Sequence, residues 1–157
     1  MEPVPVDEGT VAPGARRLRA SYALDGDGAW IAQARHLAAA FLTRARTEDD
    51  VPVSTRALEI TQLVVSELVT NARKYAPGPV RLDLRLLDDV LEVIVRDGNP
   101  ALPVPRTADP GRVGQHGLEI VMAVAQGLDV QQEPTGKRVT ARISLLDPPE
   151  AGRQRER

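Results

Sequence analysis

The stretch Leu63-Val64-Val65-Ser66-Glu67-Leu68-Val69-Thr70-Asn71-Ala72 decides how this chain of 157 residues is interpreted. Its apolar residues recur at intervals of three and four, which is the spacing of an amphipathic helix. Glu67 and Asn71 are four residues apart and therefore stand about 40° from each other on one helix face, which also carries Lys74. The stretch thus predicts a helix that buries an aliphatic stripe and presents a carboxylate, an amide and an ammonium group together.

These polar side chains suit a site for Mg²⁺ and phosphate. A hard cation takes oxygen ligands and keeps several waters, so the amide oxygen of Asn71 and the phosphates of ATP would be enough to hold Mg²⁺. An ordinary solvated pair is the competing interpretation of Glu67 and Asn71. Spacing alone favours that interpretation, because motifs this short often arise by chance. The surrounding sequence therefore has to decide.

The elements next to this helix predict a hairpin. Ser54 is a suitable N-cap for the helix, and Pro77-Gly78-Pro79 ends it. Two strictly alternating stretches follow, 80–86 and 91–96, and they are joined through Asp88-Asp89. This pattern predicts an antiparallel hairpin with one face in water and the other packed on helices.

Further along the chain in both directions, periodicity predicts five more elements. Residues 17–24 alternate like a strand, and the apolar residues of 30–46 recur as in a helix. We expect a third helix over about 118–126, ended by Gly127, and strands over 128–132 and 138–145. Hairpins without regular βαβ alternation indicate an α+β two-layer sandwich, in which helices cover one face of a mostly antiparallel sheet.

One domain fits this length, and both ends differ from it in composition. Residues 1–15 are rich in proline, glycine and acid, and residues 147–157 are rich in proline and charge, so we expect flexible tails there. The domain itself is expected to span residues 16–146. Its core must be aliphatic because aromatic residues make up only 3% of the chain.

Composition also limits the partners and the compartment. A formal net charge of −2 gives no chain-wide positive field for nucleic acid or anionic lipid, so we expect neither as a partner. The chain has no cysteine, which excludes disulfides, thiolate metal sites and thiol nucleophiles. With no signal peptide at the N-terminus and no apolar run near the ~18 residues that span a bilayer, we expect a cytoplasmic protein.

Two elements after the hairpin strengthen the nucleotide interpretation. Asp97 ends the second hairpin strand, where its carboxylate can accept the exocyclic amino group of adenine, and Gly98 lets a base approach the backbone. The segment 98–117 has four prolines and four glycines, and a loop this long is uncommon unless it is functional. It ends in 111–118, where backbone N–H groups before a helix favour anions and Arg112 adds a cation.

The order of these motifs resembles that of the GHKL ATPases. Glu67-Leu68-Val69-Thr70-Asn71-Ala72 is similar to their N box, Asp97-Gly98 to their G1 box, and Gly114-Gln115-His116-Gly117-Leu118 to their G2 box. Gly136-Lys137-Arg138-Val139-Thr140 is similar to the last glycine turn. The resemblance covers about residues 28–145 and implies the Bergerat ATP-binding fold, with a mostly antiparallel, mixed sheet. A stand-alone domain with this N box looks like the anti-sigma-factor serine/threonine kinases.

The resemblance implies roles for single residues. Asn71 would coordinate Mg²⁺, Glu67 would be the general base for a hydroxyl of a partner protein, and Asp97 would read adenine. The threonine that usually accompanies this aspartate falls near Lys137 or Arg138 here, which leaves Thr140 as a substitute. The other nucleotide-binding positions implied are Lys74, Gly98, Arg112, Gly114, His116, Gly117 and Leu118.

The resemblance also implies cofactors and partners. ATP and Mg²⁺ would be the cofactors, and the phosphoryl acceptor would be a serine or threonine of an anti-anti-sigma protein. The same surface would bind a sigma factor, and a homodimer is expected. Two alternatives stay open: a non-catalytic ATP-binding module of this fold that sequesters a partner, and the ATP-binding half of a split histidine kinase.

Overall fold

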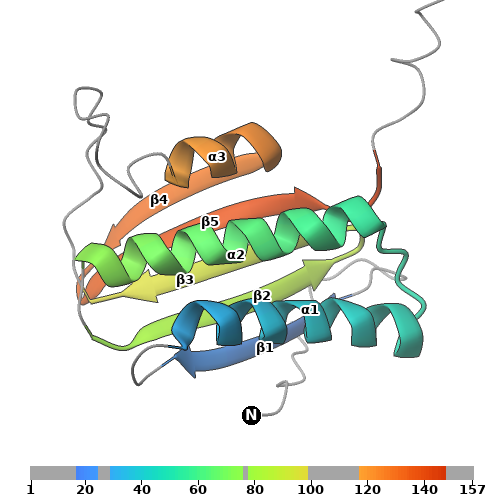
Figure 1. Ribbon diagram of the computed structural model, residues 1–157, viewed down its shortest axis with the longest axis horizontal. Coiled ribbons are helices and arrows are strands. Elements are labelled where there is room, and N and C mark those ends of the chain that lie inside the picture. The colour runs from blue at the N-terminus through green and yellow to red at the C-terminus, as the bar shows by residue number, and fades with distance from the viewer. Residues whose placement is uncertain (1–16, 25–28, 76–77, 99–116, 148–157) are drawn as a thin grey trace, which may run out of the picture.

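The computed structural model describes residues 17–24, 29–75, 78–98 and 117–147. The expected tail 1–15, and residues 148–157 of the expected tail 147–157, lie outside this part of the chain. Three helices and five strands are present in the described residues (Figure 1). In chain order they are β1 (Arg17–Leu24), α1 (Trp30–Glu48), α2 (Thr55–Tyr75), β2 (Val80–Leu87), β3 (Val90–Asp97), α3 (Gly117–Val124), β4 (Gly127–Glu133) and β5 (Gly136–Ser144).

The strands form one sheet in the order β1-β2-β3-β5-β4, and every pairing in it is antiparallel. The three helices lie on one face of this sheet, which confirms the predicted α+β sandwich (Figure 1). One boundary was predicted wrongly. α3 ends at Val124, and Gly127 begins β4 instead of ending the helix, because the Gln126 N–H donates to the Arg142 carbonyl of β5.

Alternation along the strands decides which face is covered. In β2, Leu82, Leu84 and Leu86 are fully buried against the helices, whereas Arg81 and Arg85 are exposed on the other face. The same parity holds in β3 and β5, since side chains of successive strand residues point to opposite faces. The residues of these two strands that join the helix-facing core are Leu91, Val93, Val95, Val139, Ala141 and Ile143.

α2 lies across the middle of the sheet. Its first turn is capped as predicted, because the Ala57 N–H donates to Ser54 Oγ at 2.9 Å. Its core stripe includes Val64, Val65 and Leu68, each at most 1% exposed. The helix runs so that its C-terminal end reaches the edge of the molecule where β3 ends and β5 begins, on the left of Figure 1.

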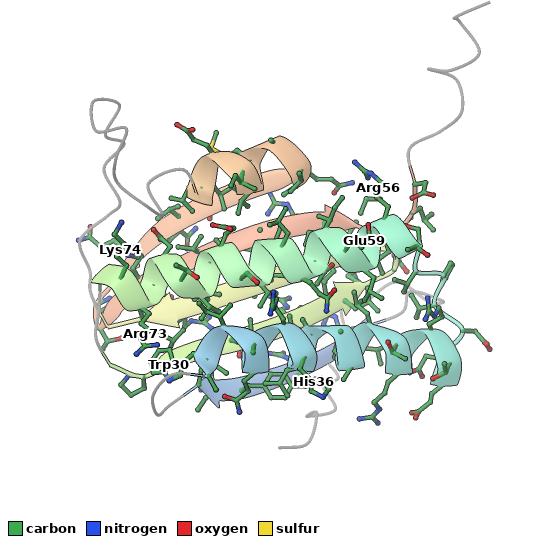
Figure 2. The ribbon with its side chains drawn as sticks, viewed as in Figure 1. Trp30, His36, Arg56, Glu59, Arg73 and Lys74 are labelled. Atoms are coloured by element: carbon green, nitrogen blue, oxygen red, sulfur yellow. The ribbon has the colours of Figure 1, made fainter. Side chains whose placement is uncertain are left out.

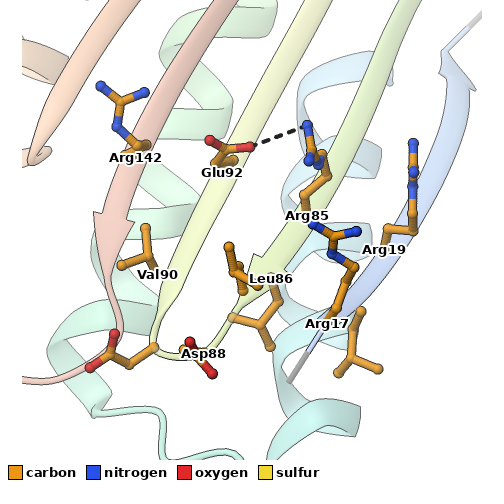
Figure 3. Close-up of a pocket in the computed structure, with 11 residues that line it drawn as sticks. Arg17, Arg19, Arg85, Leu86, Asp88, Val90, Glu92 and Arg142 are labelled. Atoms are coloured by element: carbon orange, nitrogen blue, oxygen red, sulfur yellow. Dashed lines mark ion pairs between the residues drawn. The ribbon is translucent and has the colours of Figure 1, made fainter. Parts of the chain in front are cut away.

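No helix in the described residues covers the other face of the sheet, which is rich in arginine. Arg81 and Arg96 stand opposite each other in the register of β2 and β3, and the Asp83 carboxylate contacts both guanidinium groups. Near the β2–β3 turn, this face is hollowed by a cavity of about 380 Å³, with Arg17, Arg85 and other arginines on its walls (Figure 3). We call this side the open face.

Candidate functional site

Glu67, the first of the site residues predicted on α2, lies against the start of α3. Glu67 is half-buried, and a Cβ built on Gly117 at the start of α3 would lie 2.8 Å from its Oε1 atom. The Glu67 carboxylate therefore rests against the α3 backbone, where a side chain in place of the glycine would displace it. Asn71 is one turn further along and Lys74 lies exposed near the helix end (Figure 2).

Asn71 is only 6% exposed, and its amide nitrogen has no hydrogen-bond partner among the described residues. A buried polar atom without a partner is uncommon in folded proteins and can be satisfied by a water or an ion. The nitrogen and oxygen of a carboxamide exchange places when the group rotates by half a turn, so this position can equally present an oxygen to a cation. Asn71 thus fits the role of a Mg²⁺ ligand.

The rest of a metal's coordination would have to come from outside the protein. The described residues contain no group of three or more His, Cys, Asp or Glu side chains placed to hold a metal ion. Mg²⁺ is commonly bound through one or two protein oxygens together with phosphate oxygens and waters. One amide next to a bound triphosphate is consistent with that arrangement.

Asp97 ends β3 on the helix-covered face and is paired with a residue that the sequence did not assign to the site. Its cross-strand partner on β5 is Lys137, and the Lys137 Nζ lies 3.3 Å from Asp97 Oδ2. Both side chains are 1% exposed. A lysine this deeply buried is rare unless it is paired, and the aspartate supplies the opposite charge. This ion pair is the main feature of the site that sequence reasoning missed.

Thr140, the expected companion of Asp97, is on the wrong face of the sheet. It stands opposite Ile94 in the register, three residues from the Asp97–Lys137 pair on each strand. Three is an odd number, so Thr140 points to the open face, away from Asp97. The prediction that Thr140 takes the place of the family's threonine beside Asp97 is therefore wrong, and Lys137 lies there instead.

Gly136 allows β5 to begin this close to the end of β3. A Cβ at Gly136 would lie 1.9 Å from the Asp97 carbonyl oxygen, and its φ is +159°. Gly98, by contrast, is exposed and has open space beside it among the described residues. Leu118 is half-buried in the first turn of α3. Arg112, Gly114 and His116, three further residues predicted for the site, lie outside the described residues.

A cavity of about 550 Å³ opens on the outer surface between α1 and α2 and reaches Glu67. Arg35 and His36 line it from α1, and Glu59 and Gln62 line it from α2. The half-buried Glu67 therefore lies between two features: its carboxylate rests against Gly117 of α3, and the residue also borders this cavity.

Comparison with known families gives a match over most of the chain. A family model described as a histidine kinase-like ATPase domain matches residues 28–143, which is more than half of the chain. The chain therefore belongs to the family of histidine kinase-like ATPase domains. Membership implies ATP binding and confirms the predicted resemblance at the level of the GHKL superfamily.

Two solved structures of histidine kinases are similar to the chain. A histidine kinase domain from the blue-light activated histidine kinase of Erythrobacter litoralis EL346 is 26% identical, with a TM-score of 0.44 over 57% of this chain and 45% of that one. The Acinetobacter baumannii histidine kinase AdeS is 14% identical, with a TM-score of 0.47 over 82% and 68%. The chain thus spans less than half of the Erythrobacter domain.

No curated protein matches the chain. In the part of the chain that the structure describes, none of the helices is both long enough and apolar enough to cross a bilayer.

Proposed function

We propose that this protein binds Mg-ATP and acts as a regulatory serine/threonine kinase of the anti-sigma type. Its substrate would be an anti-anti-sigma protein, and a sigma factor would be its second partner. The observation that carries the proposal is the arrangement on α2: Asn71 offers a buried amide whose nitrogen has no partner among the described residues, and Glu67 holds a carboxylate one turn away. That the nucleotide is ATP is inferred from membership of the family of histidine kinase-like ATPase domains.

In this proposal the residues of α2 position the reactants. The Asn71 amide oxygen holds Mg²⁺, which when bound neutralises the phosphate charge that develops during transfer. Glu67 accepts the proton of the acceptor hydroxyl, whose oxygen then bonds to the γ-phosphorus while the bond between that phosphorus and the β,γ-bridging oxygen breaks. ADP leaves with the electron pair of that bond. A carboxylate suits this role because phosphoryl transfer needs orientation and a proton acceptor.

Access to Glu67 supports a protein acceptor. Glu67 borders the cavity between α1 and α2, which is open to solvent on its outer side. A serine or threonine on a partner protein can therefore approach Glu67 from outside, while the nucleotide occupies the opposite side near Gly117. Arg35 and His36 line the same cavity and offer hydrogen-bond donors to a docked partner.

The first test is nucleotide binding. The single tryptophan, Trp30, has the Arg73 guanidinium 4.8 Å from its ring centre, two residues beyond Asn71, and is a natural reporter (Figure 2). We expect ATP to change Trp30 fluorescence and to release heat in calorimetry when Mg²⁺ is present. Asn71→Ala should remove the Mg²⁺ dependence. If millimolar Mg-ATP gives neither signal, the proposed function is wrong.

The second test is transfer. Radiolabelled ATP should label purified anti-anti-sigma proteins of the source organism on serine or threonine. Glu67→Gln should reduce this labelling at least ~100-fold, the usual size of general-base catalysis, and leave ATP affinity nearly unchanged. The matched control is Glu59→Gln, which alters another glutamate of the same cavity and should transfer normally. Binding without any transfer would identify a non-catalytic ATP-binding module instead.

A further inference from the structure

Burying the Asp97–Lys137 ion pair at the end of the sheet costs free energy. Moving two charges out of water costs several kcal/mol per ion, and a hydrophobic pair of similar volume would often be as stable. The rest of the helix-covered face of β3 and β5 is aliphatic. An ion pair at the one point where the strands reach the candidate site therefore calls for an explanation beyond packing.

The two groups form a ready-made hydrogen-bonding pattern. The Asp97 carboxylate accepts hydrogen bonds only, and the Lys137 ammonium donates only. Their charged atoms are 3.3 Å apart, between Asp97 Oδ2 and Lys137 Nζ. An acceptor and a donor at this spacing complement the Watson–Crick edge of adenine, where the 6-amino group donates and N1 accepts side by side. Base-binding proteins commonly read this edge by hydrogen bonds.

We propose that Lys137 is a base-reading residue. Asp97 accepts a hydrogen bond from the 6-amino group of adenine, and Lys137 donates one to N1. This inference rests on the proposed function, because it assumes that ATP enters the site. The Asp97 carboxylate and the Lys137 ammonium together recognise the base, and Gly98 leaves room for the base beside the strand end.

Burial of the Asp97–Lys137 pair makes the recognition of adenine selective. Hydrogen bonds are electrostatically stronger away from water, and a buried donor that loses its acceptor bears the full penalty of desolvation. A base that lacks the acceptor at N1 is therefore rejected more strongly than the loss of one contact alone would predict. Inosine presents an N–H at N1 and an oxygen at position 6, so it would place a donor against the Lys137 ammonium and an acceptor against the Asp97 carboxylate, and it should be rejected.

The test compares ATP with 1-deaza-ATP, in which carbon replaces N1 and the 6-amino group is kept. Calorimetric titration of the unaltered protein in Mg²⁺ should show 1-deaza-ATP binding at least ~10-fold more weakly, as expected for a charge-assisted hydrogen bond. Inosine triphosphate should also bind at least ~10-fold more weakly than ATP, and equal binding of the two would overturn the base-reading role.

Variants show which residue causes the difference. Lys137→Met should weaken ATP binding and bring ATP and 1-deaza-ATP to the same affinity. The matched control is Arg138→Met, which removes a cation from the next residue of β5 but on the open face, and it should keep the full difference between the two nucleotides. A thermal melt of each variant checks folding, and if Lys137→Met does not fold, the comparison on the unaltered protein decides.

The outcomes separate this inference from the proposed function. If ATP binds and 1-deaza-ATP binds equally well to the unaltered protein, nucleotide binding stands and the base-reading role of Lys137 is overturned. The ion pair would then serve only to join β3 and β5. If neither nucleotide binds, the proposed function fails and the role of Lys137 fails with it.

Discussion

The two faces of the sheet handle charge in opposite ways. On the helix-covered face, the strands bury aliphatic side chains up to the strand ends, where the Asp97–Lys137 pair is 1% exposed on both sides. On the open face, arginines stand in rows across neighbouring strands, and carboxylates connect them. The arginines on this face include Arg17, Arg19, Arg81, Arg85, Arg96, Arg138 and Arg142.

The open face shows how like charges are tolerated where water is close. Arg96 stands opposite both Arg81 and Arg138 in the register, and each of these repulsive pairs has an acid between its members. Asp83 contacts Arg81 and Arg96, and Glu133 lies 3.6 Å from both Arg96 and Arg138. Such partly exposed contacts contribute little individually. On the covered face, by contrast, the Lys137 ammonium and the Asp97 carboxylate lie side by side away from water.

The largest expected effect is on the buried pair. Asp97→Val leaves the Lys137 ammonium buried without this carboxylate, and Lys137→Met leaves the carboxylate without this cation. Without nucleotide, we expect each single variant to lose about 3–5 kcal/mol of unfolding free energy in urea denaturation. The double variant should regain much of this loss because it buries no charge. If each single variant loses less than ~1 kcal/mol of unfolding free energy, charge burial is not more costly on the covered face than on the open face.

The second prediction concerns the approach of the two strands that carry this pair. In Gly136→Ala, the new Cβ would meet the Asp97 carbonyl oxygen, a backbone atom, so the strand end must move. We expect a loss of about 1–3 kcal/mol in unfolding free energy, the usual cost of overpacking.

Gly117→Ala is the matched control for this glycine. Its Cβ would meet Glu67 Oε1, the far end of a flexible side chain that can swing away. The control should therefore keep the stability of the unaltered protein within ~1 kcal/mol, since alanine also gains about that much over glycine inside a helix. Equal losses in both variants would mean that the close approach at Gly136 is not what limits stability.

Much of the fold could be predicted because its signals are local. The alternation of β2 and β3 shows directly which residues face the core, and Ser54 supplies an N-cap that the structure confirms. Helical spacing alone predicted that Glu67 and Asn71 share one helix face, and the motifs further along the chain assigned that face to the site. These inferences need only the period of each element, which is a property of neighbouring residues.

The Asp97–Lys137 pair could not be predicted in this way. The two residues are brought together by the register between β3 and β5, which pack side by side although α3 and β4 separate them along the chain. Thr140 was predicted from its residue type alone. It lies between Val139 and Ala141, which are buried, so the alternation of the strand already places it on the opposite face. The face of each strand residue could thus be predicted from sequence, whereas the register between β3 and β5 could be seen only in the folded structure.

The smallest expected effect is on the open face, where Arg85 and Glu92 are directly opposite in the register and 3.5 Å apart. Their side chains are 45% and 30% exposed, so water screens the pair. A double-mutant cycle with Arg85→Ala and Glu92→Ala should give a coupling of about 0.2–1 kcal/mol. Salt should reduce it, since the Debye length falls to about 3 Å at 1 M. The Asp97–Lys137 coupling should persist at the same salt concentration, because burial shields that pair from ions. Equal salt sensitivity of the two couplings would contradict the difference between the faces.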